Sequence, residues 1–220
     1  MALSSLFILM QCHNLDYPDF YGSLYRALKP SVFHAKHRAR FFRLLALCLS
    51  STALPAYLIC AFVKKLNRLA LSAPPSGALY ALALTRSLLE KNSECMALIQ
   101  REKHCEDGFD PEESDPKKCG SLETSLWEIV ALQEHYYPAV AALAKDFKNT
   151  KWGKHHGKHD HKDDSQLSLD DYAAYTYKQI FDQEAQRSER GKNAAVPLCF
   201  KEPSGIFVPG DALHDSFSLT

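Results

Sequence analysis

Residues 30–75 constrain the fold of this chain more than any other stretch, because they are its most apolar part and are basic wherever they are charged. Ser50, Ser51, Thr52 and Pro55 interrupt the stretch near its middle. Proline suits the first turn of a helix, where the N–H that it lacks would have no partner in any case. We therefore predict two amphipathic helices joined by a turn, each with a buried apolar face and a cationic face.

The charges are segregated along the chain, although 26 basic and 26 acidic residues balance overall. Residues 20–89 contain ten lysines and arginines and no acidic residue, whereas residues 102–134 contain ten acidic residues and three lysines. A body with a basic and an acidic surface suits a component of an assembly that has different neighbours on its two sides.

The apolar pattern is helical, and no stretch alternates convincingly with a period of two residues. Similar helices separated by short, proline-marked turns predict an all-α fold of consecutive antiparallel helix pairs. Bundles and α-solenoids both fit this pattern, and prolines at the helix starts favour a HEAT/armadillo-like α-solenoid segment with an extended C-terminal tail. The expected helices are residues 2–12, 20–28, 30–49, 55–69, 74–89, 93–101, 125–135, 138–147 and 168–181.

Composition divides the chain into three parts. Residues 1–148 are expected to form a helical domain that contains an acidic loop at 102–120, where two Asp-Pro turns replace the helical pattern. Residues 149–167 are rich in histidine and lysine and have almost nothing to bury, so they are expected to be a disordered loop. Residues 168–220 are expected to form a last helix and an extended, proline-containing tail.

Helical spacing places apolar core anchors and a basic face on the same helices. The core anchors are Phe42, Leu58, Phe62, Leu66 and Trp127. The basic face consists of Lys36, Arg38, Arg40, Arg43, Lys64, Lys65 and Arg68. This face would contact RNA phosphates or an acidic protein partner, or else it is solvated or pairs with the acidic half of the chain. A protein partner is favoured over RNA, because no aromatic side chains interleave with these bases for stacking.

Other residues with reactive side chains do not make a convincing catalytic or metal site. Glu134 and His135 are adjacent in a helix, and adjacent helical residues do not face one another. Zinc or nickel could bind a histidine cluster, but a hydrophilic loop is the better interpretation, because no ordered element or cysteine lies nearby to fix a geometry. The cluster comprises His155, His156, His159 and His161.

The seven cysteines form no CxxC pair, which favours a reducing compartment, the nucleus or cytosol. Cys60 lies near Lys64 but within an apolar stripe, so a buried thiol is a better interpretation than an activated thiolate. The sequence contains no glycine-rich phosphate loop, nucleophile elbow or ligand set. We predict that the protein is not an enzyme and has no cofactor and no small-molecule substrate.

A membrane span is the main alternative for the central stretch. Leu44 to Val63 is a run of twenty uncharged residues flanked by Arg43 and Lys64. The polar residues and the proline at the centre of this run fit a turn between two helices instead. Membrane insertion is therefore disfavoured, although a nuclear-membrane location stays open as an alternative.

Three strings resemble the C-terminal domain of the CCAAT-binding-factor family of nucleolar proteins: PSVFHAKHRARFF, LSSTALPAYLICAFVKKLNRLALSAPP and ESDPKKCGSLETSLWEIVALQEHYYPAV. The resemblance runs from about residue 7 to residue 144. It implies a non-enzymatic, HEAT-like scaffold in the nucleus and nucleolus that supports rRNA processing in ribosome biogenesis. The family protein is about twice as long as this chain, so its N-terminal helical half is expected to be absent.

The same resemblance implies specific partners. The most similar type within the family works in the small-subunit processome, where it forms a stable pair with nucleolar protein fourteen. Other small-subunit processome components and pre-rRNA are further candidate partners. Loss of such a scaffold is expected to block small-subunit rRNA maturation and export of the precursor particle. The alternatives are an integral nuclear-envelope protein and a nucleic-acid-binding module that uses the basic helix face.

Overall fold

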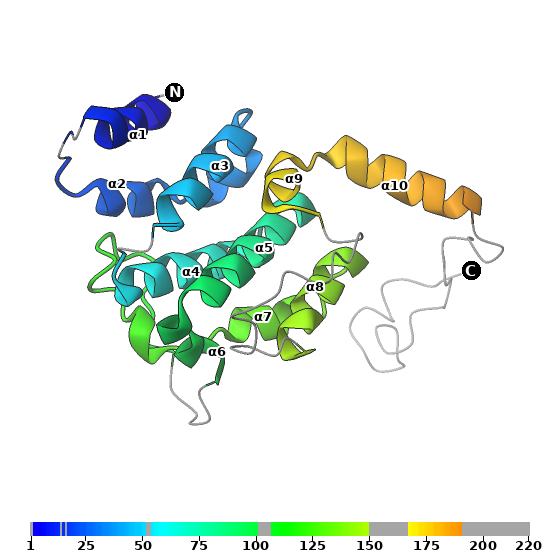
Figure 1. Ribbon diagram of the computed structural model, residues 1–220. Coiled ribbons are helices and arrows are strands. Elements are labelled where there is room, and N and C mark those ends of the chain that lie inside the picture. The colour runs from blue at the N-terminus through cyan, green and yellow to red at the C-terminus, as the bar shows by residue number, and fades with distance from the viewer. Residues whose placement is uncertain are drawn as a thin grey trace, which may run out of the picture. The chain divides into compact units, whose positions relative to one another are not determined.

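The computed structural model describes residues 2–13, 15, 17–51, 54–100, 107–149 and 167–190 (Figure 1). Every regular element within these ranges is a helix, which confirms the predicted all-α class. The His/Lys-rich loop with its four clustered histidines, the first part of the acidic loop and the extended tail lie outside the described residues. The solenoid arrangement stays a prediction.

Residues 1–177 form one compact unit, and the described part of a second unit is the portion of one helix at residues 178–190. The first unit begins with α1 (Ala2–His13), α2 (Phe20–Ala27), the 3-10 turn η1 (Pro30–His34), α3 (Arg38–Leu49), α4 (Ala56–Ala70) and α5 (Pro75–Lys91). It continues with η2 (Ser93–Met96), α6 (Ala97–Gln100), η3 (Ser121–Glu123), α7 (Trp127–Leu132), α8 (Pro138–Asn149) and α9 (Leu169–Ala174), and α10 (Tyr177–Arg190) follows.

A helical hairpin of α4 and α5 forms the centre of the first unit (Figure 1). Pro55 precedes α4 with an extended backbone, and Pro75 opens α5, as the prolines of the sequence predict. The side chains of residues 76–82 on α5 are all buried, because α4, α8 and α9 pack around this helix. Each fully buried leucine or phenylalanine of such a core contributes about 1.5–3 kcal/mol to folding.

Aromatic and polar contacts join the hairpin to α3 and its two helices to one another. The rings of Phe42 on α3 and Tyr80 on α5 stack with centroids 4.1 Å apart, and the Tyr80 hydroxyl donates to the Phe42 carbonyl at 2.6 Å. Between α4 and α5, the buried Asn67 side chain donates to the hydroxyl of Thr85 at 2.8 Å. These bonds satisfy polar groups that burial would otherwise leave unpaired.

Two helices predicted as continuous are interrupted. The predicted helix 30–49 is divided by Ala35, whose extended backbone separates η1 from α3, and the predicted helix 168–181 is divided by the extended Tyr175. Arg38 links the two interrupted segments, because its guanidinium donates to the carbonyl of Phe33 at 3.1 Å and to that of Tyr175 at 2.6 Å. The second bond joins residues 137 positions apart, which helical periodicity cannot detect.

The sequence places a serine three residues before an acidic residue at two expected helix starts, Ser125 with Glu128 and Ser168 with Asp171, and this spacing predicts a capping box at each. Ser168 and Asp171 form the predicted box at the start of α9, where each side chain accepts the other's backbone N–H. The box predicted from Ser125 and Glu128 is wrong, because α7 begins at Trp127 without a side-chain cap and ends at Leu132. Glu128 instead points into the interior, as described below.

The uncharged run at residues 44–63 is divided between α3 and α4. Among the described residues, no helix is both long enough and apolar enough to cross a membrane.

Candidate functional site

The predicted basic face does not lie on one open surface, and Lys64 is the clearest departure. Its side chain is fully buried, so the prediction that Lys64 lies on the outer side of α4 is wrong. The ammonium nitrogen lies 2.9 Å from the Glu128 carboxylate and 3.2 Å from that of Asp107, and it donates to the backbone carbonyl of Ser125 at 2.6 Å. An ammonium has three donors, so these three groups saturate it.

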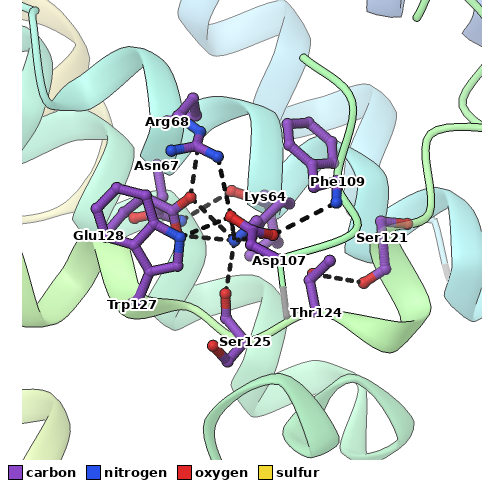
Figure 2. Close-up of polar contacts among 11 residues, drawn as sticks. Lys64, Asn67, Arg68, Asp107, Phe109, Ser121, Thr124, Ser125, Trp127 and Glu128 are labelled. Atoms are coloured by element: carbon purple, nitrogen blue, oxygen red, sulfur yellow. Dashed lines mark hydrogen bonds and ion pairs between the residues drawn. The ribbon is translucent and has the colours of Figure 1, made fainter. Parts of the chain in front are cut away.

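Arg68 lies one helical turn after Lys64 and reaches the same two carboxylates (Figure 2). Its guanidinium contacts Asp107 at 2.9 Å and Glu128 at 3.5 Å. The Trp127 indole N–H donates to Asp107 at 2.6 Å, and the Trp127 ring lies 4.7 Å from the Arg68 guanidinium carbon. We call Lys64, Arg68, Asp107, Trp127 and Glu128 the ion cluster; it joins α4 to α7 and to the segment that begins at residue 107.

The ion cluster is electrically balanced, with two cations and two carboxylates. Burial raises the pKa of Glu128 above its ordinary value, although the hydrogen bond from Lys64 opposes this rise. Burial acts in the same sense on Asp107, but the bond from Trp127 and the charge of Lys64 outweigh it and hold the pKa of Asp107 below its ordinary value. Because a buried ion pair gains little net energy over apolar packing, we interpret the cluster as a device that fixes the register of α7 on α4.

Three further residues of the predicted basic face also contact other parts of the chain. Lys65 donates to the Tyr25 carbonyl at 3.1 Å and lies 3.9 Å above the Tyr25 ring. Arg38 makes the two carbonyl bonds already described, and Arg43 lies 3.7 Å from Asp170. Lys36 and Arg40 are exposed, in the turn before α3 and on α3 respectively.

The predicted core anchors separate into two groups. Phe42, Leu58, Phe62 and Leu66 are all buried. Trp127 is 38% exposed, so it is a surface residue rather than a core anchor. Its indole has a polar edge that bonds to Asp107 and an apolar face that covers Arg68, and this explains why a large aromatic side chain is placed at the surface.

The other residues with reactive side chains make hydrogen bonds within the fold or are buried. The His135 ring nitrogen Nδ1 accepts the backbone N–H of Tyr137 at 3.0 Å, and burial lowers the pKa of His135. A hydrogen bond with Cys95 and burial both raise the pKa of the Cys60 thiol, which opposes formation of a thiolate. Within the described ranges, no group of three or more histidine, cysteine or acidic side chains is placed to hold a metal ion.

Sequence reasoning missed Asp107 and Glu128 as the partners of the basic helices. The signal for them was the charge segregation, since an acid-free half next to an acidic segment indicates pairing between the two. That pattern cannot identify which carboxylates are used, because Lys64 and Glu128 are 64 residues apart and only the packing of α7 on α4 brings them together.

Comparison with known proteins identifies a family match and similar full-length relatives. Residues 1–144 match the CBF/Mak21 family. The chain is 52% identical over 147 residues to the nucleolar complex protein 4 homolog of Homo sapiens, which covers 66% of this chain and 28% of the human protein. It is 39% identical over 246 residues to the protein NUCLEOLAR COMPLEX ASSOCIATED 4 of Arabidopsis thaliana, which covers all of this chain and 41% of the plant protein. The chain therefore spans less than half the length of these curated relatives.

Proposed function

The chain belongs to the CBF/Mak21 family, and from that premise we propose that it is a non-enzymatic scaffold in nucleolar ribosome biogenesis. The observation that carries this proposal is the 52% identity to a nucleolar complex protein 4 homolog over 66% of the chain. We further propose that it acts in small-subunit rRNA processing and precursor export, within the small-subunit processome and through a stable pair with nucleolar protein fourteen.

The placement of the charges supports a protein scaffold more than an RNA-binding module. Lys64 and Arg68 are engaged with carboxylates of the chain itself, and Arg38 and Lys65 with its carbonyl groups. Non-specific RNA binding needs several cations that are free to neutralise phosphates. Because folding engages these four, fewer of the predicted bases are left for a nucleic acid.

The proposal can be tested by purifying the tagged chain from nucleolar extract. Nucleolar protein fourteen and small-subunit precursor RNA should co-purify with it, and nuclease treatment should leave the protein pair intact. Recovery of the folded chain from the nucleolus with neither component would refute the proposal.

Two variants on α3 make the test specific to the folded unit. Phe42 is 1% exposed and Leu47 is 50% exposed, so Phe42→Asp buries an unpaired charge whereas Leu47→Asp leaves its charge in water. We expect Phe42→Asp to lose both nucleolar components and Leu47→Asp to retain them. Loss in both variants would indicate that α3 itself is a contact surface rather than a part of the core.

A further inference from the structure

The outward side of α7 carries large apolar side chains that the described part of the unit does not cover. Trp127 is 38% exposed and Val130 is 58% exposed, whereas Glu128, Ile129 and Leu132 face the interior. Trp127 and Val130 are three residues apart and so share one side of α7, and the exposed Glu134 lies in the turn that follows the helix.

This side of α7 adjoins the C-terminal end of α4. Arg68 contacts the Trp127 ring, and Leu71 lines a surface hollow of about 610 Å³ together with the 134–136 turn. His34 and residues 72–74 complete the lining of the hollow. We call this surface the α4–α7 seam; its main residues are Arg68, Leu71, Trp127, Val130, Glu134 and Tyr136.

The seam is apolar and carries one uncompensated negative charge. Arg68 is neutralised within the ion cluster, and among the described residues no cation lies within ion-pair distance of Glu134. Beside Glu134, Tyr136 is 79% exposed and Leu71 is 37% exposed. One face of the Tyr136 ring stacks on the His135 ring with centroids 4.4 Å apart, which leaves the other face open. A carboxylate next to an open aromatic ring suits a cation, which the ring attracts through its face.

We propose that the α4–α7 seam binds a protein segment that presents an arginine or lysine beside apolar side chains. The cation would lie between Glu134 and the Tyr136 ring, and the apolar side chains would cover Val130, Trp127 and Leu71. RNA is disfavoured as the occupant, because the free charge of the seam has the same sign as a phosphate. The choice of a protein as the partner rests on the proposed scaffold function. The apolar and acidic character of the seam is observed independently of that function.

The test is an NMR titration of the isotopically labelled full chain with two short blocked peptides. One has the sequence Leu-Arg-Leu and the other Leu-Glu-Leu, so they differ only in the central residue, which is a cation in the first and an anion in the second. The Leu-Arg-Leu peptide should shift the amide signals of the seam and bind about tenfold more tightly than its acidic counterpart, because an exposed ion pair and a cation–π contact add together. Glu134→Gln and Tyr136→Ala should each reduce that difference by removing one of the two contributions, and Leu47→Ala on α3 should leave it unchanged.

Equal binding of the two peptides, or shifts confined to other surfaces, would overturn the proposal. A single-stranded oligouridine that shifts the seam residues more strongly than the Leu-Arg-Leu peptide would overturn it in favour of RNA. The nucleolar co-purification of the unmodified chain does not depend on this titration, so the proposed function and the proposed binding surface can fail separately.

Discussion

Lys64→Met is the substitution that tests the ion cluster most directly. Methionine keeps most of the length of the lysine side chain but removes the ammonium that Glu128, Asp107 and the Ser125 carbonyl share. Glu128 has a fully buried side chain, and the one cation it would keep among the described residues is the Arg68 guanidinium, 3.5 Å away. Removing one partner from a buried ion pair costs about 3–5 kcal/mol, which is a large part of the 5–15 kcal/mol of a typical domain.

A double-mutant cycle separates the interaction from the packing. Glu128→Gln alone should cost about 2 kcal/mol, because Lys64 keeps Asp107 and Ser125 as partners. In the double variant neither buried charge is left unpaired, and Asp107 still has Arg68 and Trp127. The double variant should therefore be less destabilised than the sum of the single variants, with a coupling of about 2–3 kcal/mol.

Urea unfolding at neutral pH, followed by far-ultraviolet circular dichroism, measures the four free energies of unfolding. Arg86→Met is the matched control, because it removes a partly exposed pair with Glu90 at 3.1 Å, which should contribute only about 0.3–0.5 kcal/mol. If Lys64→Met costs no more than Arg86→Met, or if the cycle shows no coupling, the cluster does not hold α7 on α4.

Three further predictions concern acid stability and close packing. The pKa of Asp107 lies below its ordinary value, so its contribution to stability should be present above about pH 4 and lost as the pH falls further. In urea unfolding at a series of pH values, Asp107→Asn should reduce the decrease in the free energy of unfolding below about pH 4. The same decrease in the variant and the unmodified chain would contradict the lowered pKa of Asp107. A Cβ at Gly77 would meet the buried ring of Phe33, so Gly77→Ala should lower the free energy of unfolding by about 1–3 kcal/mol. In a chain that already carries Phe33→Leu, Gly77→Ala should cost less. Equal costs in the unmodified chain and in the Phe33→Leu variant would contradict the clash. Gly120 has φ +70° and a backbone carbonyl beside its missing Cβ, whereas Gly108 faces open space. Gly120→Ala should therefore lower the midpoint of thermal unfolding by several degrees, unlike Gly108→Ala; similar midpoints would show that the turn tolerates a side chain.

The central hairpin could be predicted from the sequence because its signals are local. Apolar periodicity placed α4 and α5, and the prolines at residues 55 and 75 mark their starts. Pro138 likewise opens α8, and Ser168 caps α9. Each of these signals acts within one turn of the residue that carries it, so no knowledge of the packing is needed.

Features that depend on distant contacts were not predictable. Periodicity assigns Lys64 to the polar side of α4, but η3 and α7 pack against this helix and α5 packs against it too, so little of its surface is left open. The interruptions at Ala35 and Tyr175 also lie beside a long-range contact, because Arg38 donates to the carbonyl of Phe33 in η1 and to that of Tyr175 at the end of α9. The local patterns of a single sequence do not show which distant residues form such bonds.

The contacts that Arg38, Lys64, Lys65 and Arg68 make within the chain change which experiments can report on binding. Reversing the charge of Lys64 or Arg68 would place a third negative charge beside Asp107 and Glu128, so the variant would fail to fold whether or not these bases meet a partner. Lys36, Arg40 and Arg43 are exposed, and substitutions at exposed positions usually change stability by no more than about 0.5 kcal/mol. A loss of RNA or partner binding is therefore interpretable only in variants of these three residues. A loss in variants of the ion cluster reports on the attachment of α7 to α4, and through it on the α4–α7 seam.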